Sequence, residues 1–301
     1  MSPRRAFLSC VPSARVAPAI ALAALAAMAA TAVHPQERPD RSERADRSER
    51  AGPVSVRLGL DYPLRANEDD PGGSIGAGSQ GVPAVSPTAQ ASVRWTPVEG
   101  DYWYLQGTLF RYLRPSLKRS WNPEFTYGFG YDDWHPGTWS FTYGNYNGNR
   151  LDPDRASGEH RWNFERGTWS AAYKFPLPEA WRRDASDTFG CAAGAHLTPR
   201  YTEAGTAAQR DWKKSVTLGC RYALASGWFA SFTAVGWPQG GQQQPWDPDY
   251  TYGFGYFNWR PGGFSVQYNN YSGNRWPGRD RAPRQGGFRN GSLSVSWNLP
   301  W

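Results

Sequence analysis

The chain alternates apolar and polar residues over many short segments. In residues 138–143, which read TWSFTY, the aromatic side chains fall at every second position. The same alternation recurs in residues 250–256 and 263–268. A period of two predicts β-strands with one apolar face, and here that face is rich in Tyr and Trp.

Extending this pattern along the chain predicts twelve strands. Most span about nine to twelve residues, the length that a tilted strand needs to cross a bilayer. The expected strands lie near 54–64, 90–98, 102–113, 123–134, 138–148, 166–177, 187–201, 213–224, 228–238, 250–259, 263–273 and 289–301.

The expected connections alternate in length. Short turns follow the even-numbered strands, at 99–101, 135–137, 225–227 and 260–262, with a longer link at 178–186. Longer polar loops follow odd-numbered strands, at 65–89, 149–165, 239–249 and 274–288. Outer-membrane barrels have short periplasmic turns, long external loops and an even number of strands. This alternation of short and long connections predicts an all-β fold, a transmembrane antiparallel up-and-down β-barrel of about twelve strands. A ten-stranded version stays open, because loop 65–89 separates the first strand from the rest.

The barrel is predicted to arise from an internal duplication. Residues 121–150 align with 246–275 without a gap at an offset of 125, and 18 of the 30 positions are identical. A repeat this long indicates duplication of a sheet segment of about six strands rather than a solenoid unit. We place the halves of the barrel domain, residues 53–301, at about 53–177 and 187–301.

The first residues are expected to be a signal peptide rather than part of the fold. Three arginines precede or open an apolar run at 16–30, and the run ends in a small-x-small cleavage pattern, so the signal is placed at 1–32. Residues 33–52 follow as a charged linker containing a repeated Asp-Arg-Ser-Glu-Arg segment. Its charges cancel and it has no apolar face, so it is expected to be disordered.

The C-terminal strand carries the most specific signal. Its apolar residues occupy every odd position, and the chain ends on an aromatic residue; the set is Leu293, Val295, Trp297, Leu299 and Trp301. This pattern resembles the C-terminal signature of bacterial outer-membrane barrels, which the barrel assembly machinery recognises. The resemblance is to that broad class and to no specific family. It implies a protein of the outer membrane, surrounded by outer-membrane lipids.

Charge and composition narrow the functional classes. Without the three signal arginines the formal charge falls from +7 to +4, and there is no basic helix or zinc-ligand spacing, so nucleic-acid binding is not expected. No cofactor is expected either. The acidic run at 68–70 lies in a Gly-rich loop and is better explained as solvated than as a metal site.

The face opposite the aromatic one predicts the lining of the lumen. It consists mostly of Gly, Ser and Thr with a few charges, namely Arg57, Arg94, Lys174, Arg221, Asp61 and Asp132. A basic lining favours anionic solutes by focusing the electric field in a narrow pore. The same charges can instead pair across the lumen and brace it, and both interpretations stay open.

Two further sets of residues are singled out by their positions. Asn145, Arg150, Asn270 and Arg275 are expected at the external mouth, either contacting sugars or, as we favour, forming a polar turn after an aromatic belt. Cys191 and Cys220 lie on consecutive strands at comparable depth. An oxidising compartment permits a disulfide between them, although a register error of one residue would prevent it.

An enzymatic function receives the least support, and no catalytic residues are expected. Outer-membrane phospholipases use a His-x-Ser-Asn-Gly pattern, and the nearest match, at 270–274, has no His. By period, His196 lies on an inner face and Ser272 on an outer face, so they are not expected to meet. The preferred function is a narrow channel for small anionic or saccharide solutes. The alternatives are a non-conducting structural or accessory barrel of an envelope or polysaccharide-export system and, last, a lipid hydrolase.

Overall fold

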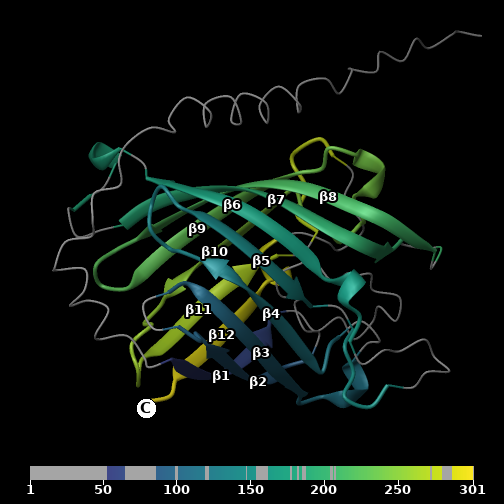
Figure 1. Cartoon of the computed structure of the whole chain (residues 1–301), viewed down its shortest axis with the longest axis horizontal. Helices are drawn as coiled ribbons and strands as arrows, with labels where there is room; N and C mark the ends of the chain where they lie inside the picture. Colours follow the sequence, from purple (N-terminus) through teal and green to yellow (C-terminus); the bar gives the residue numbers. More distant parts are fainter. Residues whose placement is uncertain are drawn as a thin grey trace, which may run out of the picture. The chain divides into compact units, whose positions relative to one another are not determined.

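The described residues form a closed antiparallel barrel of twelve β-strands (Figure 1). The computed structural model describes residues 53–64, 86–98, 101–118, 122–146, 148–153, 162–176, 178–181, 183–184, 188–203, 206, 208–271, 273–279 and 287–300. The expected signal peptide and linker lie outside the described residues. The barrel confirms the predicted all-β up-and-down fold and its strand number.

Each strand is hydrogen-bonded to its neighbours in sequence, and the first strand also pairs with the last. The strands are β1 (Val54–Pro63), β2 (Thr88–Trp95), β3 (Trp103–Tyr112), β4 (Phe125–Asp132), β5 (Trp139–Asn145), β6 (Thr168–Pro176), β7 (Thr188–Thr202), β8 (Gln209–Ala223), β9 (Trp228–Gly236), β10 (Tyr250–Tyr256), β11 (Phe264–Asn270) and β12 (Ser292–Asn298). Short 3-10 turns are η1 (Pro115–Leu117), η3 (Phe164–Arg166), η4 (Glu179–Trp181), η5 (Gly240–Gln242) and η6 (Phe288–Asn290).

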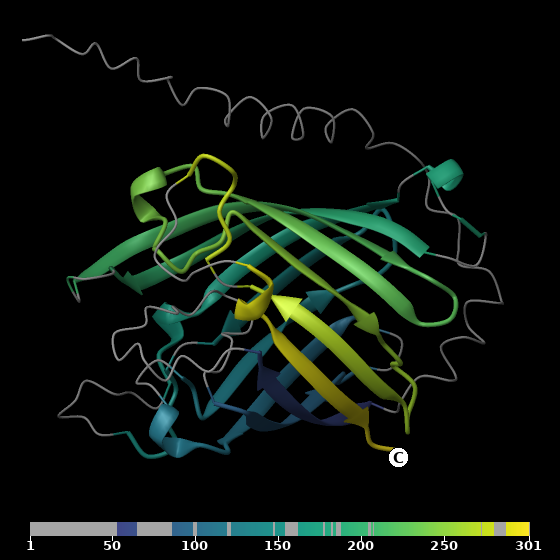
Figure 2. The same cartoon turned by 180° about the vertical axis from the view of Figure 1, so that it is seen from behind.

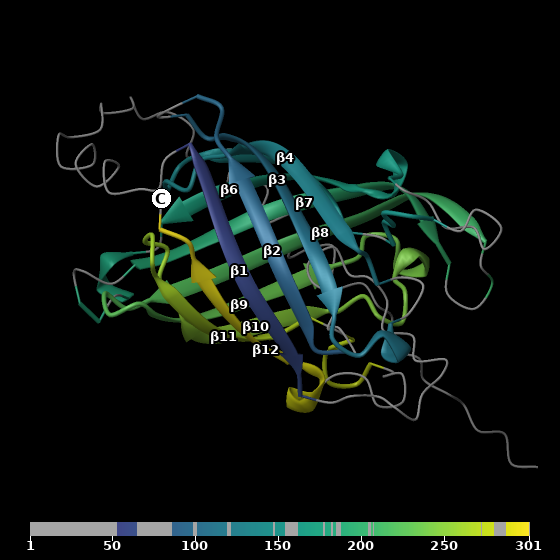
Figure 3. The same ribbon diagram turned by 90° about the horizontal axis from the view of Figure 1, so that it is seen from below.

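The closure of the barrel lies at β1. This strand runs between β2 and β12 (Figure 3), with Leu58 opposite both Ala91 and Trp297. The ten-stranded alternative, in which the first strand stays outside the barrel, is therefore wrong. Among the described residues, no helix has the length and apolar character needed to span a bilayer.

The two ends of the barrel differ, as the connection lengths predicted. At one end, here named the turn end, β8 and β9 are joined by residues 224–227 and β4 and β5 by residues 133–138. At the other, named the loop end, β3–β4 and β9–β10 are joined through η1 and η5 (Figure 2). The β7–β8 connection departs from this alternation of lengths, because it lies at the loop end and is short. Both strands have 15 residues, so β8 begins four residues earlier than predicted and only 203–208 link the pair.

Side chains alternate between the two faces of the wall, and the apolar face points outward. In β3, Trp103, Leu105 and Leu109 are 51%, 47% and 55% exposed, whereas Thr108 and Tyr112 are both 7% exposed. A soluble barrel buries its apolar face, so this inverted arrangement is that of a barrel whose outer wall contacts lipid.

The duplicated Gly-Phe-Gly segment has a structural reason. Gly130 in β4 and Gly255 in β10 have φ of 153° and 152°, a region that L side chains rarely adopt. A Cβ would lie 2.3 Å from the Phe141 carbonyl oxygen at Gly130 and 2.2 Å from the Val266 carbonyl oxygen at Gly255. Both halves therefore need glycine at this position for β4–β5 and β10–β11 to approach.

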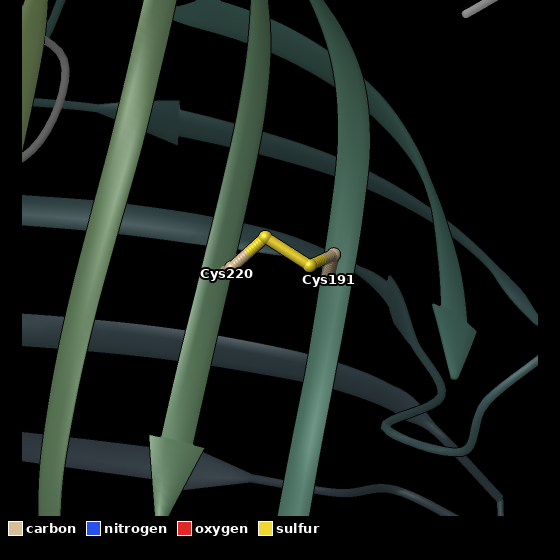
Figure 4. Close-up of a disulfide and its surroundings, with 2 residues drawn as sticks. All are labelled: Cys191 and Cys220. Atoms are coloured by element: carbon tan, nitrogen blue, oxygen red, sulfur yellow. A yellow bond between two sulfur atoms is a disulfide. The ribbon is translucent and has the colours of Figure 1, made fainter. Parts of the chain in front are cut away.

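A disulfide joins β7 to β8 (Figure 4). Cys191 and Cys220 lie directly opposite each other in the register, with Cα atoms 4.0 Å apart. Leu218 shares the parity of Cys220 and is exposed on the outer wall, so the bridge lies on the outer face. It covalently links the two longest strands of the barrel.

Candidate functional site: the lumen

The basic side chains of the lumen gather near the turn end. Arg94 is the penultimate residue of β2, and its neighbours Val93 and Trp95 point outward. Lys174 and Arg221 are each third from the end of a strand that runs toward the same end. Arg57 lies near the start of β1, opposite Asn298. The structure therefore places all four predicted basic residues on the inner face, in one zone.

Both acidic residues of the predicted lining already have partners. Asp132 forms an ion pair with Lys174, whose ammonium also donates to the Asp133 carbonyl oxygen at 2.8 Å. Asp61 accepts a hydrogen bond from the hydroxyl of Ser294 on the adjacent strand β12. Lys174 is thus paired with a carboxylate two strands away along the wall, and not across the lumen as the bracing interpretation proposed.

Arg94 and Arg221 are held by aromatic rings instead of carboxylates. The Arg94 guanidinium lies 3.9 Å from the centre of the Tyr104 ring, and the Arg221 guanidinium lies 4.0 Å from the centre of the Phe229 ring. Such cation–π contacts hold a cation in place without neutralising its charge.

The two stacks occupy equivalent positions in the repeated sequence. Residue 106 lies opposite Arg94, and residue 231 lies opposite Arg221, at the repeat offset of 125. Tyr104 and Phe229 are related by the same offset. The two halves therefore contribute equivalent arginine–aromatic stacks to one lumen.

Arg57 connects to the second of these stacks. Its Nε donates to Asn298 Oδ1 at 2.9 Å, and its guanidinium lies 5.5 Å from the centre of the Phe257 ring. The Arg221 guanidinium lies 5.3 Å from the centre of the same ring. Phe257 therefore lies between two cations near the turn end.

Sequence reasoning missed the aromatic partners of these cations. Tyr104 and Phe229 follow outward-facing tryptophans by one residue, so the period-two pattern already placed them inside. The alternation therefore already indicated that these rings face the lumen, but the predicted lining contained only charged and small side chains. Phe257 comes just after β10 in a turn, where alternation no longer indicates direction.

His196 is part of the lumen wall. Its Nδ1 is hydrogen-bonded to the Ser170 hydroxyl at 2.8 Å, and its Nε2 to the Thr217 hydroxyl at 3.0 Å. The ring thus bridges β6, β7 and β8 through hydroxyl groups. A hydrolytic Ser–His pair has a carboxylate or amide that orients the base, and here a threonine hydroxyl occupies that place. Ser272 lies outside the described residues.

At the loop end, a buried tyrosine organises each half. Tyr143 in β5 stacks on both Phe129 and Phe164, with ring centres 5.1 and 4.2 Å away, and its hydroxyl donates to the Phe164 carbonyl oxygen at 2.7 Å. Tyr268 in β11 makes the same contacts with Phe254 and Phe288. The segments containing η3 and η6 are thereby fastened against the barrel wall. We name these two clusters the tyrosine clasps.

The asparagines expected at the external mouth, Asn145 and Asn270, belong to the tyrosine clasps and are 0% exposed. The arginines expected with them, Arg150 and Arg275, are 3% and 7% exposed and donate to backbone carbonyl oxygens of neighbouring loops. Asn270 Nδ2 donates to the Gly287 carbonyl oxygen at 2.7 Å. This burial favours the polar turn over the alternative of contact with sugars, because the side chains satisfy backbone carbonyl groups of the loops that fold over them.

The predicted assembly signal lies on the outer face where it is described. Leu293 and Trp297 are exposed, and the alternation of β12 places Val295 and Leu299 on the same side. Trp301 lies outside the described residues. Within the part of the chain that the structure describes, no group of three or more His, Cys, Asp or Glu side chains is arranged to hold a metal ion.

The sequence matches no protein-family profile and no curated protein. Three solved structures share low similarity with the barrel. The OmpF of Salmonella typhi, in complex with daunomycin, is 11% identical, with a TM-score of 0.34 over 82% of this chain and 96% of that one. An outer membrane channel from Pseudomonas putida F1 is 14% identical, with a TM-score of 0.33 over 88% and 99%. A mutant of the Rh. blastica porin is 12% identical, with a TM-score of 0.31 over 82% and 99%.

Proposed function

We propose that this barrel is a narrow channel of the bacterial outer membrane that favours small anionic solutes, including acidic saccharides. The observation that carries the proposal is the state of the lumen charges. Among the described residues, Arg57, Arg94 and Arg221 have no carboxylate partner, whereas both lumen carboxylates are engaged. The zone near the turn end therefore carries a net positive charge.

Uncompensated cations in a narrow lumen act strongly on passing ions. The low-dielectric wall focuses their field and raises the local concentration of anions. Guanidinium groups also bind carboxylates and phosphates through paired N–H donors. The rings of Tyr104, Phe229 and Phe257 lie beside these groups, so an acidic sugar would meet both charge and aromatic surface.

A non-conducting accessory barrel is the second candidate. The observation that favours it is the entry of Tyr104, Phe229 and Phe257 into the lumen at the level of the arginines. Twelve strands lie between the small filled barrels of eight strands and the open porins of sixteen or more. Conductance decides between these two candidates. A lipid hydrolase has the least support, because His196 is surrounded by hydroxyl groups.

The test is planar-bilayer recording of the purified barrel in a salt gradient. We expect unitary current steps with an anion-selective reversal potential in the wild type. The double substitution Arg94→Glu with Arg221→Glu should reverse the selectivity. Arg289→Glu, an equal change of charge at an exposed position of η6, is the control and should leave the selectivity unchanged. The absence of unitary steps from folded protein would overturn the channel, and unchanged selectivity of the double variant would overturn the arginine lining.

We further propose that the chain is exported by its N-terminal signal and assembled by the barrel assembly machinery, with the turn end in the periplasm. The alternating outward side chains of β12 support recognition by that machinery. Substitution of Leu293 and Trp297 by Ser should leave unfolded protein in the periplasm. Substitution of Leu105 by Ser, at an outward-facing position of β3, should not. Fractionation and heat-modifiable gel migration measure both outcomes.

A further inference from the structure

The outer wall of the barrel contains an apolar groove. It spans β3 to β8 and has a volume of about 650 Å³. Its residues that matter here are Phe141, Trp169, Ala171, Ala195, Val216 and Lys214. The volume is in the range of pockets that hold small organic ligands.

The side chains of the groove point toward lipid. Phe141 and Trp169 are 54% and 41% exposed, and Ala171 shares the parity of Trp169 in β6. Across the strands, Phe141 lies opposite Ala171, and Ala171 lies opposite Ala195. Two adjacent alanines therefore form a floor, and large aromatic side chains rise beside it.

The equivalent region of the outer wall, on β11, β12 and β1, has a different set of side chains at the same register positions. By register, Val295 corresponds to Ala171 and Leu60 to Ala195, because each pair lies at the same distance from the repeated tyrosines of β5 and β11. On the walls, Val266 and Leu293 correspond to Phe141 and Trp169. The groove thus has taller walls and a lower floor than the equivalent region on β11, β12 and β1.

A cation lies at the end of the groove nearest the loop end. Lys214 lines the groove, is exposed, and lies opposite Leu197, in the row that also contains Trp169. Its backbone N–H donates to Gln242 Oε1 at 3.0 Å, which fixes the strand there. Within the described part of the chain, its ammonium has no carboxylate partner. An apolar groove that ends in an exposed ammonium matches a lipid with an apolar chain and an anionic headgroup.

We propose that this groove is a specific site for one acyl chain of an anionic phospholipid, with Lys214 pairing with the phosphate. The aromatic walls hold the chain by dispersion contacts, and the alanine floor lets it approach the sheet. Such a site orders one lipid against the barrel, in addition to the lipid that covers the rest of the wall. The site does not depend on whether the lumen conducts.

Native mass spectrometry of the barrel released from detergent tests the proposal, with dipalmitoyl phosphatidylglycerol as the probe and dipalmitoyl phosphatidylcholine as the zwitterionic comparison. We expect one phosphatidylglycerol to bind more tightly than the others. The double variant Ala171→Val with Ala195→Leu introduces the larger side chains found at the equivalent positions of β12 and β1. It should weaken that binding at least tenfold. Lys214→Gln should keep chain binding but remove the preference for phosphatidylglycerol.

The matched control is the reverse exchange, Val295→Ala with Leu60→Ala, which should leave the tight lipid site in the groove intact. Heat-modifiable migration checks that every variant is folded. Equal phosphatidylglycerol binding by the wild type and the filled variant would overturn the proposal. A filled variant that changes oligomeric state without changing lipid binding would also overturn it, and would assign the groove to a second copy of the chain.

Discussion

The guanidinium groups of Arg94 and Arg221 occupy equivalent positions in the two halves of the barrel. One lies 3.9 Å from the centre of the Tyr104 ring and the other 4.0 Å from the centre of the Phe229 ring. Because β2 and β8 are separated by half of the twelve strands, one stack lies on each side of the lumen. The two cationic sites therefore face a common space.

The halves have diverged around these shared stacks. Asp132 in β4 corresponds to Phe257 at the repeat offset of 125, and Lys174 corresponds by register to Asn298. The first half therefore has an ion pair at positions where the second has the Phe257 ring and an asparagine, and this ring lies beside Arg57 of β1 and Arg221 of β8. Among the described residues, neither arginine has a carboxylate partner.

The second glycine of each repeated Gly-Phe-Gly segment should resist substitution. Gly255→Ala and Gly130→Ala place a Cβ on a backbone carbonyl oxygen at a positive φ, so each should lower the free energy of unfolding by more than ~1 kcal/mol. Urea unfolding in lipid vesicles measures the loss. Gly241→Ala is the control, because its Cβ would meet nothing within 4 Å. Equal stability of all three variants would contradict the proposed reason for the repeat.

The disulfide should stabilise the barrel without defining its fold. Cys191 and Cys220 close a segment with a sequence separation of 29, and such cross-links typically contribute ~2–4 kcal/mol, in large part by restricting the unfolded chain. A double Cys→Ser variant should keep its heat-modifiable migration but unfold at lower urea concentration. Addition of reductant during unfolding should lower the wild-type midpoint toward that of the variant. The variant itself should not respond to reductant.

Tyr268 and Asn270 of the second tyrosine clasp should contribute different amounts to the free energy of unfolding. Tyr268→Phe removes two hydrogen bonds, the one that the hydroxyl donates to the Phe288 carbonyl oxygen and the one that it accepts from Asn270 Nδ2, and should cost ~1 kcal/mol for each. Asn270→Leu leaves the Gly287 carbonyl, the Tyr268 hydroxyl and the buried Asn274 amide without this partner, and should cost more, ~1–3 kcal/mol for each buried group. Unfolding free energies measure both. Costs that are equal for the two variants would contradict the assignment of Asn270 as the central residue.

The loop after β5 should weaken in acid through Glu124, whose carboxylate accepts the Leu151 N–H. Burial raises the pKa of this carboxyl, but hydrogen bonds from Lys118 and the Leu151 N–H outweigh burial and hold the pKa below its ordinary value. A carboxyl with a lowered pKa contributes stability above its unfolded pKa of ~4.3, and that stability is lost as the pH falls through the lowered folded value.

The corresponding measurement compares the wild type with Glu124→Gln. The variant should be less stable at about pH 7, and the difference should shrink toward about pH 3 as the carboxyl becomes protonated. A stability difference that stays constant across this pH range would show that the carboxylate charge does not stabilise the loop after β5.

The sequence by itself determined the architecture. Alternation of neighbouring residues is a local property, so twelve strands and their inner and outer faces could be predicted without knowing their partners. The same reasoning placed Arg57, Arg94, Lys174 and Arg221 on the inner face. The gapless repeat also predicted that the two halves share a structure.

Only the tertiary structure decided the partners of each side chain. Whether Lys174 meets a carboxylate while Arg221 meets a ring depends on the register between strands, which alternation does not specify. The burial of Asn270 depends on a loop that returns over the strand, and the apolar groove depends on residues of six strands meeting on one face. These contacts join residues far apart in the chain, so no local pattern records them.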